Sequence, residues 1–317
     1  MIFEISKIFS FILILFLILL VIIYYHLNSL FHIYNLNKID TDFEYHKYQQ
    51  FFITQKIIDK SGWLLTLNDA YFINGLIRKF KPKKCLEVGV ARGGSSIIIL
   101  NAIKDISDSI LISIDLNTKL FIDNTKETGY AVKQYFSELT NKWKLYTGDQ
   151  PHKFLDKINM KFDFLFLDTS HYTPGEIINI IEILPFLNEG AIVVLHDIIW
   201  HLDGTENFRE VKFTPTQIYL MSSLYGQKIY INSTLTGLQN IGCVKLYPNQ
   251  KEHYKDYFLL LMSFWEEMPN DNQINDLRNF IKKYYVQDIF LKIFDSAVKK
   301  NKIYINNFKT KLNQCLK

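Results

Sequence analysis

The sequence lacks the features that define several classes of protein. It has three cysteines, Cys85, Cys243 and Cys315, and no two of them have the C-x-x-C spacing of a zinc or redox site. A disulfide framework and a zinc site are therefore not predicted, and a reducing compartment fits best. Lysine and arginine form no run longer than a pair, and the net charge is only +4. Nucleic acid is disfavoured as a partner, because phosphate binding needs concentrated positive charge.

Internal repeats and low-complexity segments are also missing. Apolar residues make up 48% of the chain and aromatic residues 15%, which is ample for a packed core and argues against disorder. The 317 residues give room for one medium domain with additions, or for two small ones.

One long apolar run is present near the start of the chain. Residues 8–25 contain no charged residue, and as a helix they would be about 27 Å long, close to the roughly 30 Å of a bilayer core. A retained anchor is predicted over a cleaved signal peptide, because no small-x-small cleavage site follows. The predicted organisation is a transmembrane anchor at 1–30, a helical linker or cap at 31–65, a main domain at 66–250 and a C-terminal helical extension at 251–317.

Residues 84–100, KCLEVGVARGGSSIIIL, contain a glycine-rich turn between a short strand and a helix. Gly89, Gly93 and Gly94 permit a tight turn in which backbone can approach a ligand. The helix that follows directs its free N–H groups and its positive dipole end into that turn. The spacing Glu-x-Gly-x-x-x-Gly differs from the Gly-x-Gly-x-x-Gly that pyrophosphate binding requires.

Short apolar runs alternate with stretches of helical spacing through most of the chain, which predicts an α/β fold with a doubly wound, parallel sheet. The predicted strands are 85–88, 110–114, 143–146, 162–167, 191–195, 228–231 and 242–246. The predicted helices include 67–80, 174–187, 215–224, 254–267 and 274–299.

Polar residues follow these strands at their carboxyl ends. They are Glu87, Asp115, Asp149, Asp168 and the pair His196-Asp197. Open α/β sheets bind ligands at this edge, where loops and helix N-termini converge. One acid at a strand end is often a helix cap, but five beside a glycine turn predict a binding site.

These residues resemble the class I S-adenosylmethionine-dependent methyltransferases over roughly 67–247. The segments LEVGVARGGSS, FLFLDTSHY and LPFLNEGAIVVLHDI are similar to the metal-dependent catechol-type O-methyltransferases and to bacterial sugar and antibiotic O-methyltransferases. The resemblance implies a Rossmann-like sheet that is mostly parallel with an antiparallel last strand, and makes 66–250 the methyltransferase domain. The residues that it implies for binding S-adenosyl-L-methionine are Glu87, Gly89, Gly93, Ser95, Asp115, Asp149 and Gln150. Among these, Ser95 would bind the carboxylate of the methionine, Asp115 both ribose hydroxyls, and 148–150 the adenine side.

The same resemblance implies a catalytic pair and a metal site. His171 falls where the catechol-type enzymes have a lysine general base, and Asp168 is expected beside it. Asp168, His196 and Asp197 match the positions that hold Mg²⁺ or another divalent cation, although the family has an acid where this chain has His196.

The expected activity is methylation of a hydroxyl on a sugar, a glycan or another small molecule. The expected partners are that acceptor, a membrane reached through the N-terminal helix, and a second copy of the chain in a homodimer. A single-pass membrane protein with its catalytic domain on the cytosolic side is predicted, because S-adenosylmethionine is a cytosolic metabolite. Two alternatives stay open, an inactive membrane-tethered binding module of the same fold and a nicotinamide-dependent oxidoreductase.

Overall fold

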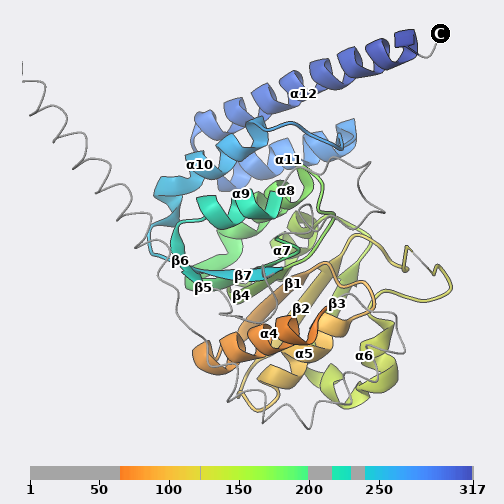
Figure 1. Ribbon diagram of the computed structural model, residues 1–317. Coiled ribbons are helices and arrows are strands. Elements are labelled where there is room, and N and C mark those ends of the chain that lie inside the picture. Colours follow the sequence, from red (N-terminus) through yellow and green to blue (C-terminus); the bar gives the residue numbers. More distant parts are fainter. Residues whose placement is uncertain (1–64, 122, 199–215, 230–239, 316–317) are drawn as a thin grey trace, which may run out of the picture.

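The computed structural model describes residues 65–121, 123–198, 216–229 and 240–315. In this part of the chain a seven-stranded sheet lies between two layers of helices (Figure 1). Its strand order is β3-β2-β1-β4-β5-β7-β6. The strands are β1 (Lys84–Val88), β2 (Ile110–Asp115), β3 (Trp143–Thr147), β4 (Phe162–Leu167), β5 (Leu187–His196), β6 (Gly226–Ile229) and β7 (Ile241–Leu246).

The strand directions confirm the predicted sheet. The pairs β1–β2, β1–β4, β2–β3 and β4–β5 are parallel, whereas β7 runs antiparallel to both β5 and β6. The order reverses between β1 and β4, so the chain winds outward from β1 in both directions. In such a sheet the ligand site lies outside the carboxyl ends of the strands, at the point of reversal.

The two helical layers cover opposite faces of the sheet (Figure 1). One layer contains α4 (Leu67–Phe80), α5 (Gly94–Ile103) and α6 (Tyr130–Tyr135), with the 3-10 helix η2 (Ser137–Lys142) beside them. The other contains α7 (Pro151–Ile158), α8 (Gly175–Ile183), α9 (Thr216–Ser223), α10 (Tyr254–Leu259), α11 (Asp271–Tyr284) and α12 (Asp288–Cys315), with the 3-10 helices η3 (Leu184–Phe186), η6 (Gln250–His253) and η7 (Leu260–Met262).

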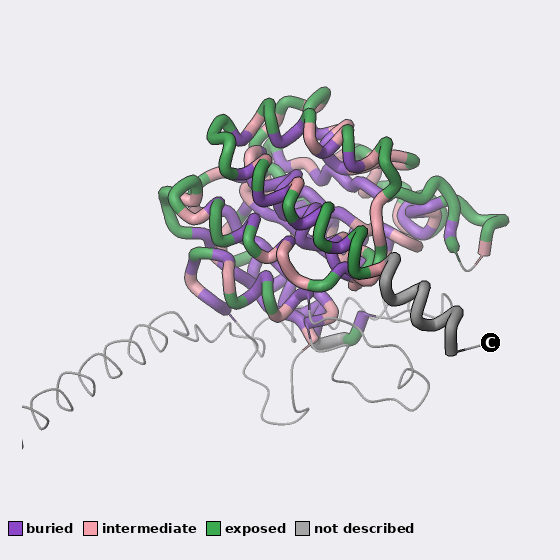
Figure 2. Tube along the Cα trace, turned by 90° about the horizontal axis from the view of Figure 1, so that it is seen from above, coloured by how far each residue is buried: buried purple, intermediate pink, exposed green. Residues whose placement is uncertain are grey.

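Successive residues of each strand enter different cores, because side chains alternate between the two faces of a sheet. Leu86 and Val88 pack toward α8 and the C-terminal helices, whereas Cys85 packs toward α4 and α5. The central strands β1, β2 and β4 are buried on both faces, which explains their nearly continuous apolar sequences (Figure 2).

Local sequence signals set the ends of α4. Thr66 and Asp69 form a reciprocal capping box at its start. Lys81 adopts a left-handed conformation at its end, and Pro82 follows. The predicted helix 67–80 is confirmed with the same bounds.

Two predicted C-terminal helices were wrong in extent. The helix expected over 254–267 ends at Leu259 and continues only as η7. The helix expected over 274–299 is two helices, α11 and α12, which are separated at 285–287. No glycine or proline marks this break. Tyr285 is buried there and donates a hydrogen bond to the carbonyl of Ile181, so tertiary packing interrupts the helical pattern.

The C-terminal helices share the core of the sheet. Tyr257, Phe258, Leu261 and Trp265 are buried in the same cluster as α8. The side of this segment that contains Tyr254, Tyr257, Phe258 and Leu261 is therefore a packing face.

The predicted localisation needs correction. No helix in the described part of the chain is long and apolar enough to cross a membrane, so the prediction of a single-pass membrane protein is not upheld. The apolar run 8–25 and the predicted linker at 31–65, apart from Leu65, lie outside the described residues.

Candidate functional site

The glycine turn brings the end of β1 against the end of β4. Gly89 has φ +89°, and a Cβ added to it would lie 1.6 Å from the carbonyl oxygen of Asp168. Gly93 has φ +97°, and its Cβ would lie 2.9 Å from Cγ2 of Val132. A side chain at Gly89 would clash with backbone and one at Gly93 with the side chain of Val132, and both positions also have a positive φ, so glycine is needed at each.

Glu87 lies beneath this turn, fully buried. Its carboxylate accepts hydrogen bonds from the hydroxyls of Ser95 at 2.6 Å and of Ser96 and Ser113 at 2.5 Å. Burial raises the pKa of Glu87 to about 7, although the three hydroxyls oppose this rise. Glu87 thus ties the first turn of α5 to β2. The Ser95 hydroxyl is committed to Glu87, so only the backbone N–H of Ser95 is left for a ligand carboxylate.

Asp115 ends β2 and is held by backbone. Its Oδ2 accepts the N–H groups of Val90 at 2.8 Å and Ala91 at 3.0 Å, and its Oδ1 accepts the N–H of Asn117 at 2.8 Å. A carboxylate has about four accepting positions, so about one is left on Oδ1. The carboxylate is therefore oriented by the glycine turn and can take one hydroxyl without disturbing these bonds.

Asp149 and Gln150 lie at the neighbouring strand end. The N–H of Gly148 donates to the carbonyl of Asp115 at 3.0 Å, which fixes this segment beside β2. The exposed side chain of Asp149 forms an ion pair with Lys153 at 3.3 Å. Gln150 is the N-cap residue of α7.

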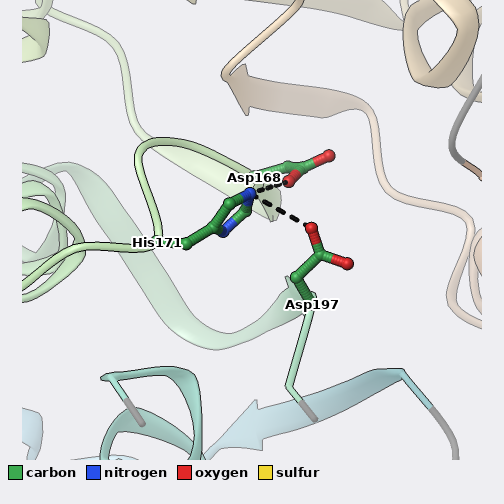
Figure 3. A group of neighbouring side chains, drawn as sticks. All are labelled: Asp168, His171 and Asp197. Atoms are coloured by element: carbon green, nitrogen blue, oxygen red, sulfur yellow. Dashed lines mark ion pairs between the residues drawn. The ribbon is translucent and has the colours of Figure 1, made fainter. Parts of the chain in front are cut away.

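Two aspartates and two histidines meet at the ends of β4 and β5, and we call Asp168, His171, His196 and Asp197 the strand-end cluster. Nε2 of His171 lies 3.1 Å from Oδ2 of Asp197 and 3.6 Å from Oδ1 of Asp168 (Figure 3). Nδ1 of His196 lies 3.3 Å from Oδ2 of Asp168 and 3.4 Å from Oδ1 of Asp197. Each aspartate therefore presents one oxygen to each imidazole.

Each imidazole also contacts a third carboxylate, which is buried behind it. Nδ1 of His171 is hydrogen-bonded to Oε1 of Glu176 at 3.1 Å, and Gln217 donates to the same oxygen. Nε2 of His196 faces Oδ2 of Asp69 at 3.5 Å. Sequence reasoning missed Glu176 and Asp69 because they come from α8 and α4, with no local motif to connect them to the strand ends.

The carboxylates around the two histidines shift the pKa values of both imidazoles. Burial alone would lower the pKa of His171, but the hydrogen bond and charge of Glu176 and the charges of Asp168 and Asp197 raise it to about 9. Burial would also lower the pKa of His196, but the neighbouring carboxylates, Asp168 first, raise it well above its ordinary value. Without a cation, His171 is therefore protonated at neutral pH, and the carboxylates around His196 favour its protonated form.

The cluster has the donor chemistry of a cation site. One ligand atom from each of Asp168, His171 and Asp197 lies within 4.8 Å of the others. His196, the third member of the predicted metal set, faces the other carboxylate oxygen of each aspartate. The structure thus brings the predicted catalytic pair and the predicted metal residues into one site.

Comparison with known proteins shows which class of domain this part of the chain resembles. Residues 86–198 match the family model of a methyltransferase domain. The match begins within β1 and ends just after β5, so it includes the glycine turn, Asp115 and the strand-end cluster. It confirms the resemblance to class I S-adenosylmethionine-dependent methyltransferases, and with it the prediction of a methyltransferase that uses S-adenosyl-L-methionine. It does not favour the oxidoreductase or the inactive binding module.

Solved structures that resemble the chain at low sequence identity include two methyltransferases. The O-methyltransferase TomG from Streptomyces achromogenes, involved in tomaymycin synthesis and solved with S-adenosylmethionine, is 14% identical, with a TM-score of 0.45 over 61% of this chain and 89% of that one. The methyltransferase PaMTH1 from Podospora anserina, bound to S-adenosylhomocysteine, is 15% identical, with a TM-score of 0.46 over 67% and 90%. No curated protein matches the chain.

Proposed function

We propose that this protein transfers the methyl group of S-adenosylmethionine to a hydroxyl oxygen of a sugar, a glycan or another small molecule. The observation that carries the proposal is the placement of the strand-end cluster. It lies at the same carboxyl edge of the sheet as the glycine turn and Asp115, within the segment 86–198 that matches the methyltransferase family.

The turn residues fit a sulfonium nucleoside. Gly89 and Gly93 leave the backbone of the turn open, and the N–H groups at the start of α5 suit the carboxylate of the methionine moiety. Oδ1 of Asp115 accepts a ribose hydroxyl. Asp149 and Gln150 border the adenine side. S-adenosylmethionine supplies a methyl group that its sulfonium has already activated, so the protein has to position and activate the acceptor.

The strand-end cluster activates the acceptor hydroxyl. Neutral His171 accepts the hydrogen bond of the hydroxyl at Nε2 and takes its proton as the oxygen attacks the methyl group; a cation beside Asp168 and Asp197 would favour this neutral form by offsetting their charge. The carboxylate of Asp168, 3.6 Å from that nitrogen, stabilises the imidazolium that forms. Glu176 is hydrogen-bonded to Nδ1 of His171, so Nε2 is the ring nitrogen that is left to contact the acceptor hydroxyl. The donor set of Asp168, His196 and Asp197 fits a divalent cation, which supplies charge that lowers the pKa of a hydroxyl beside it.

The test uses the full chain with methyl-labelled S-adenosylmethionine and a panel of catechols, sugars and sugar glycosides, and follows transfer of the label. Turnover on at least one hydroxyl acceptor is expected. The His171→Gln variant should lose about 10²- to 10⁴-fold in rate, the usual contribution of a positioned acid or base. His152→Gln is the matched control, since His152 is also buried and bonded to a glutamate, Glu182 at 2.6 Å, away from the cluster. Equal rates for the two variants would contradict the role of His171.

A further inference from the structure

The two histidines of the strand-end cluster differ in access. The side chain of His171 is 18% exposed, whereas that of His196 is 2% exposed. An imidazole that takes a proton from an acceptor has to reach that acceptor. His171 meets this requirement and His196 does not.

His196 is also unusual in its contacts. Neither of its ring nitrogens makes a hydrogen bond to another described residue. Nδ1 instead points at two carboxylates at 3.3 and 3.4 Å, and Nε2 at a third at 3.5 Å. Three carboxylates thus face one buried imidazole, and the single positive charge of its protonated form offsets only one of theirs, so the site favours a further partner of positive charge.

We propose that this partner is a divalent transition-metal ion, bound by Nδ1 of His196 and by one carboxylate oxygen from each of Asp168 and Asp197. The inference deepens the proposed function, because the same cluster activates the acceptor hydroxyl. An all-oxygen set suits Mg²⁺, whereas imidazole suits ions such as Fe²⁺, Ni²⁺ and Zn²⁺. The histidine at position 196 therefore changes the class of ion that the site prefers.

Asp69 is the positioning residue for this ligand. A histidine that binds a metal usually donates its other ring N–H to a carboxylate or carbonyl, which fixes the ring and its tautomer. Oδ2 of Asp69 is the group that faces Nε2 of His196. Asp69 is itself held by the N–H of Thr66 at 2.8 Å and by its hydroxyl at 2.7 Å. The capping box of α4 thus fixes a carboxylate that orients a ligand on β5.

The test adds Co²⁺ or Mg²⁺ alone to the purified full chain. Calorimetry should show Co²⁺ binding about tenfold or more tightly than Mg²⁺. Proton NMR of the Co²⁺ protein should show one strongly shifted exchangeable signal, from the Nε2–H of a metal-bound histidine. That signal should be absent from His196→Asp and present in His171→Asn. His196→Asp should also lower the preference for Co²⁺ over Mg²⁺, because an Asp oxygen replaces Nδ1 at a similar reach.

Two further variants test the positioning role. Asp69→Asn should weaken Co²⁺ binding about 10- to 100-fold, the usual effect of removing a group that orients a ligand. Glu176→Gln, its counterpart on His171, should leave Co²⁺ affinity unchanged. Circular dichroism checks that each variant folds, and His196→Asn replaces His196→Asp if the latter does not.

Three results would overturn the inference. They are the absence of a shifted imidazole signal in the Co²⁺ protein, its persistence in His196→Asp, and its loss in His171→Asn, which would make His171 the ligand. These results are independent of the methyltransferase proposal, because S-adenosylhomocysteine binding and methyl transfer are measured separately.

Discussion

Gly89 and the carbonyl of Asp168 approach each other so closely that no side chain fits between them. A Cβ on Gly89 would lie 1.6 Å from that carbonyl oxygen, and the N–H of Asp168 donates to the carbonyl of Val88 at 3.0 Å. The turn that is proposed to face the cofactor and the first residue of the strand-end cluster are therefore one rigid unit.

A Gly89→Ala substitution should disturb both parts of the site. We expect it to lower the free energy of unfolding by more than about 2 kcal/mol, because it adds a backbone clash to the strain of a positive φ. Chemical denaturation measures this loss. Gly190→Ala is the control: Gly190 also has a positive φ, +74°, but nothing lies within 4 Å of its Cβ position. It should cost about 1 kcal/mol. Equal losses for the two variants would show that the contact with Asp168 is unimportant.

Glu87 should contribute to folding, because it joins β1, β2 and α5. Glu87→Gln replaces one accepting oxygen with an amide N–H, so at least one of the three serine hydroxyls loses its acceptor. The free energy of unfolding should fall by about 1–3 kcal/mol. Denaturation of the variant and of Glu189→Gln, at an exposed position of β5, gives the comparison. No difference between the two variants would argue that the buried carboxylate is not needed for folding.

The histidine cluster predicts a pH dependence of stability in the metal-free protein. The pKa of His171 is about 9 in the folded protein against an ordinary 6.5, so the folded state holds its proton more tightly. The contribution of His171 to the free energy of unfolding is fully present below pH 6.5 and is lost as the pH rises through 9. The loss should be on the order of 3 kcal/mol.

Denaturation across this pH range, in the presence of a chelator, measures the effect. The difference in unfolding free energy between the wild-type protein and His171→Gln isolates His171 from other titrating groups, such as buried Lys228, whose pKa is lowered to about 8 by burial. That difference should shrink as the pH rises. A difference that stays constant would mean that the surrounding acids do not hold a proton on His171.

Much of the fold could be predicted because its signals are local. The bounds of β4 and α4 follow from an apolar run and from a capping box with a trailing proline, and the structure has them where the sequence put them. The separation of α11 from α12 could not be predicted in this way. It depends on the packing of Tyr285 against Ile181, about a hundred positions earlier in the chain.

The site residues also divide into those that local sequence signals predict and those whose placement depends on tertiary packing. Asp168, His171, His196 and Asp197 follow strands that lie side by side, so their meeting was predictable once the sheet was. The burial of His196 and the carboxylates behind the two imidazoles were not, because Asp69 and Glu176 sit on helices whose placement depends on tertiary packing. The Ser95 hydroxyl was predicted to bind the cofactor carboxylate, but in the structure it donates its hydrogen bond to Glu87.

The central claim is that the carboxyl edge of the sheet binds S-adenosylmethionine with Asp115 at the ribose. Titration calorimetry of the full chain with S-adenosylhomocysteine tests it most directly. One binding site per chain is expected, weakened about tenfold or more in Asp115→Asn, because the amide replaces an accepting oxygen of a group that is also fixed to the turn. Asp123→Asn, in the exposed loop that follows, should bind like the wild-type protein. Two results would contradict the account. One is a folded wild-type protein that shows no binding of S-adenosylhomocysteine by calorimetry or another direct binding assay, and the other is an Asp115→Asn variant that binds it as tightly as the wild-type protein.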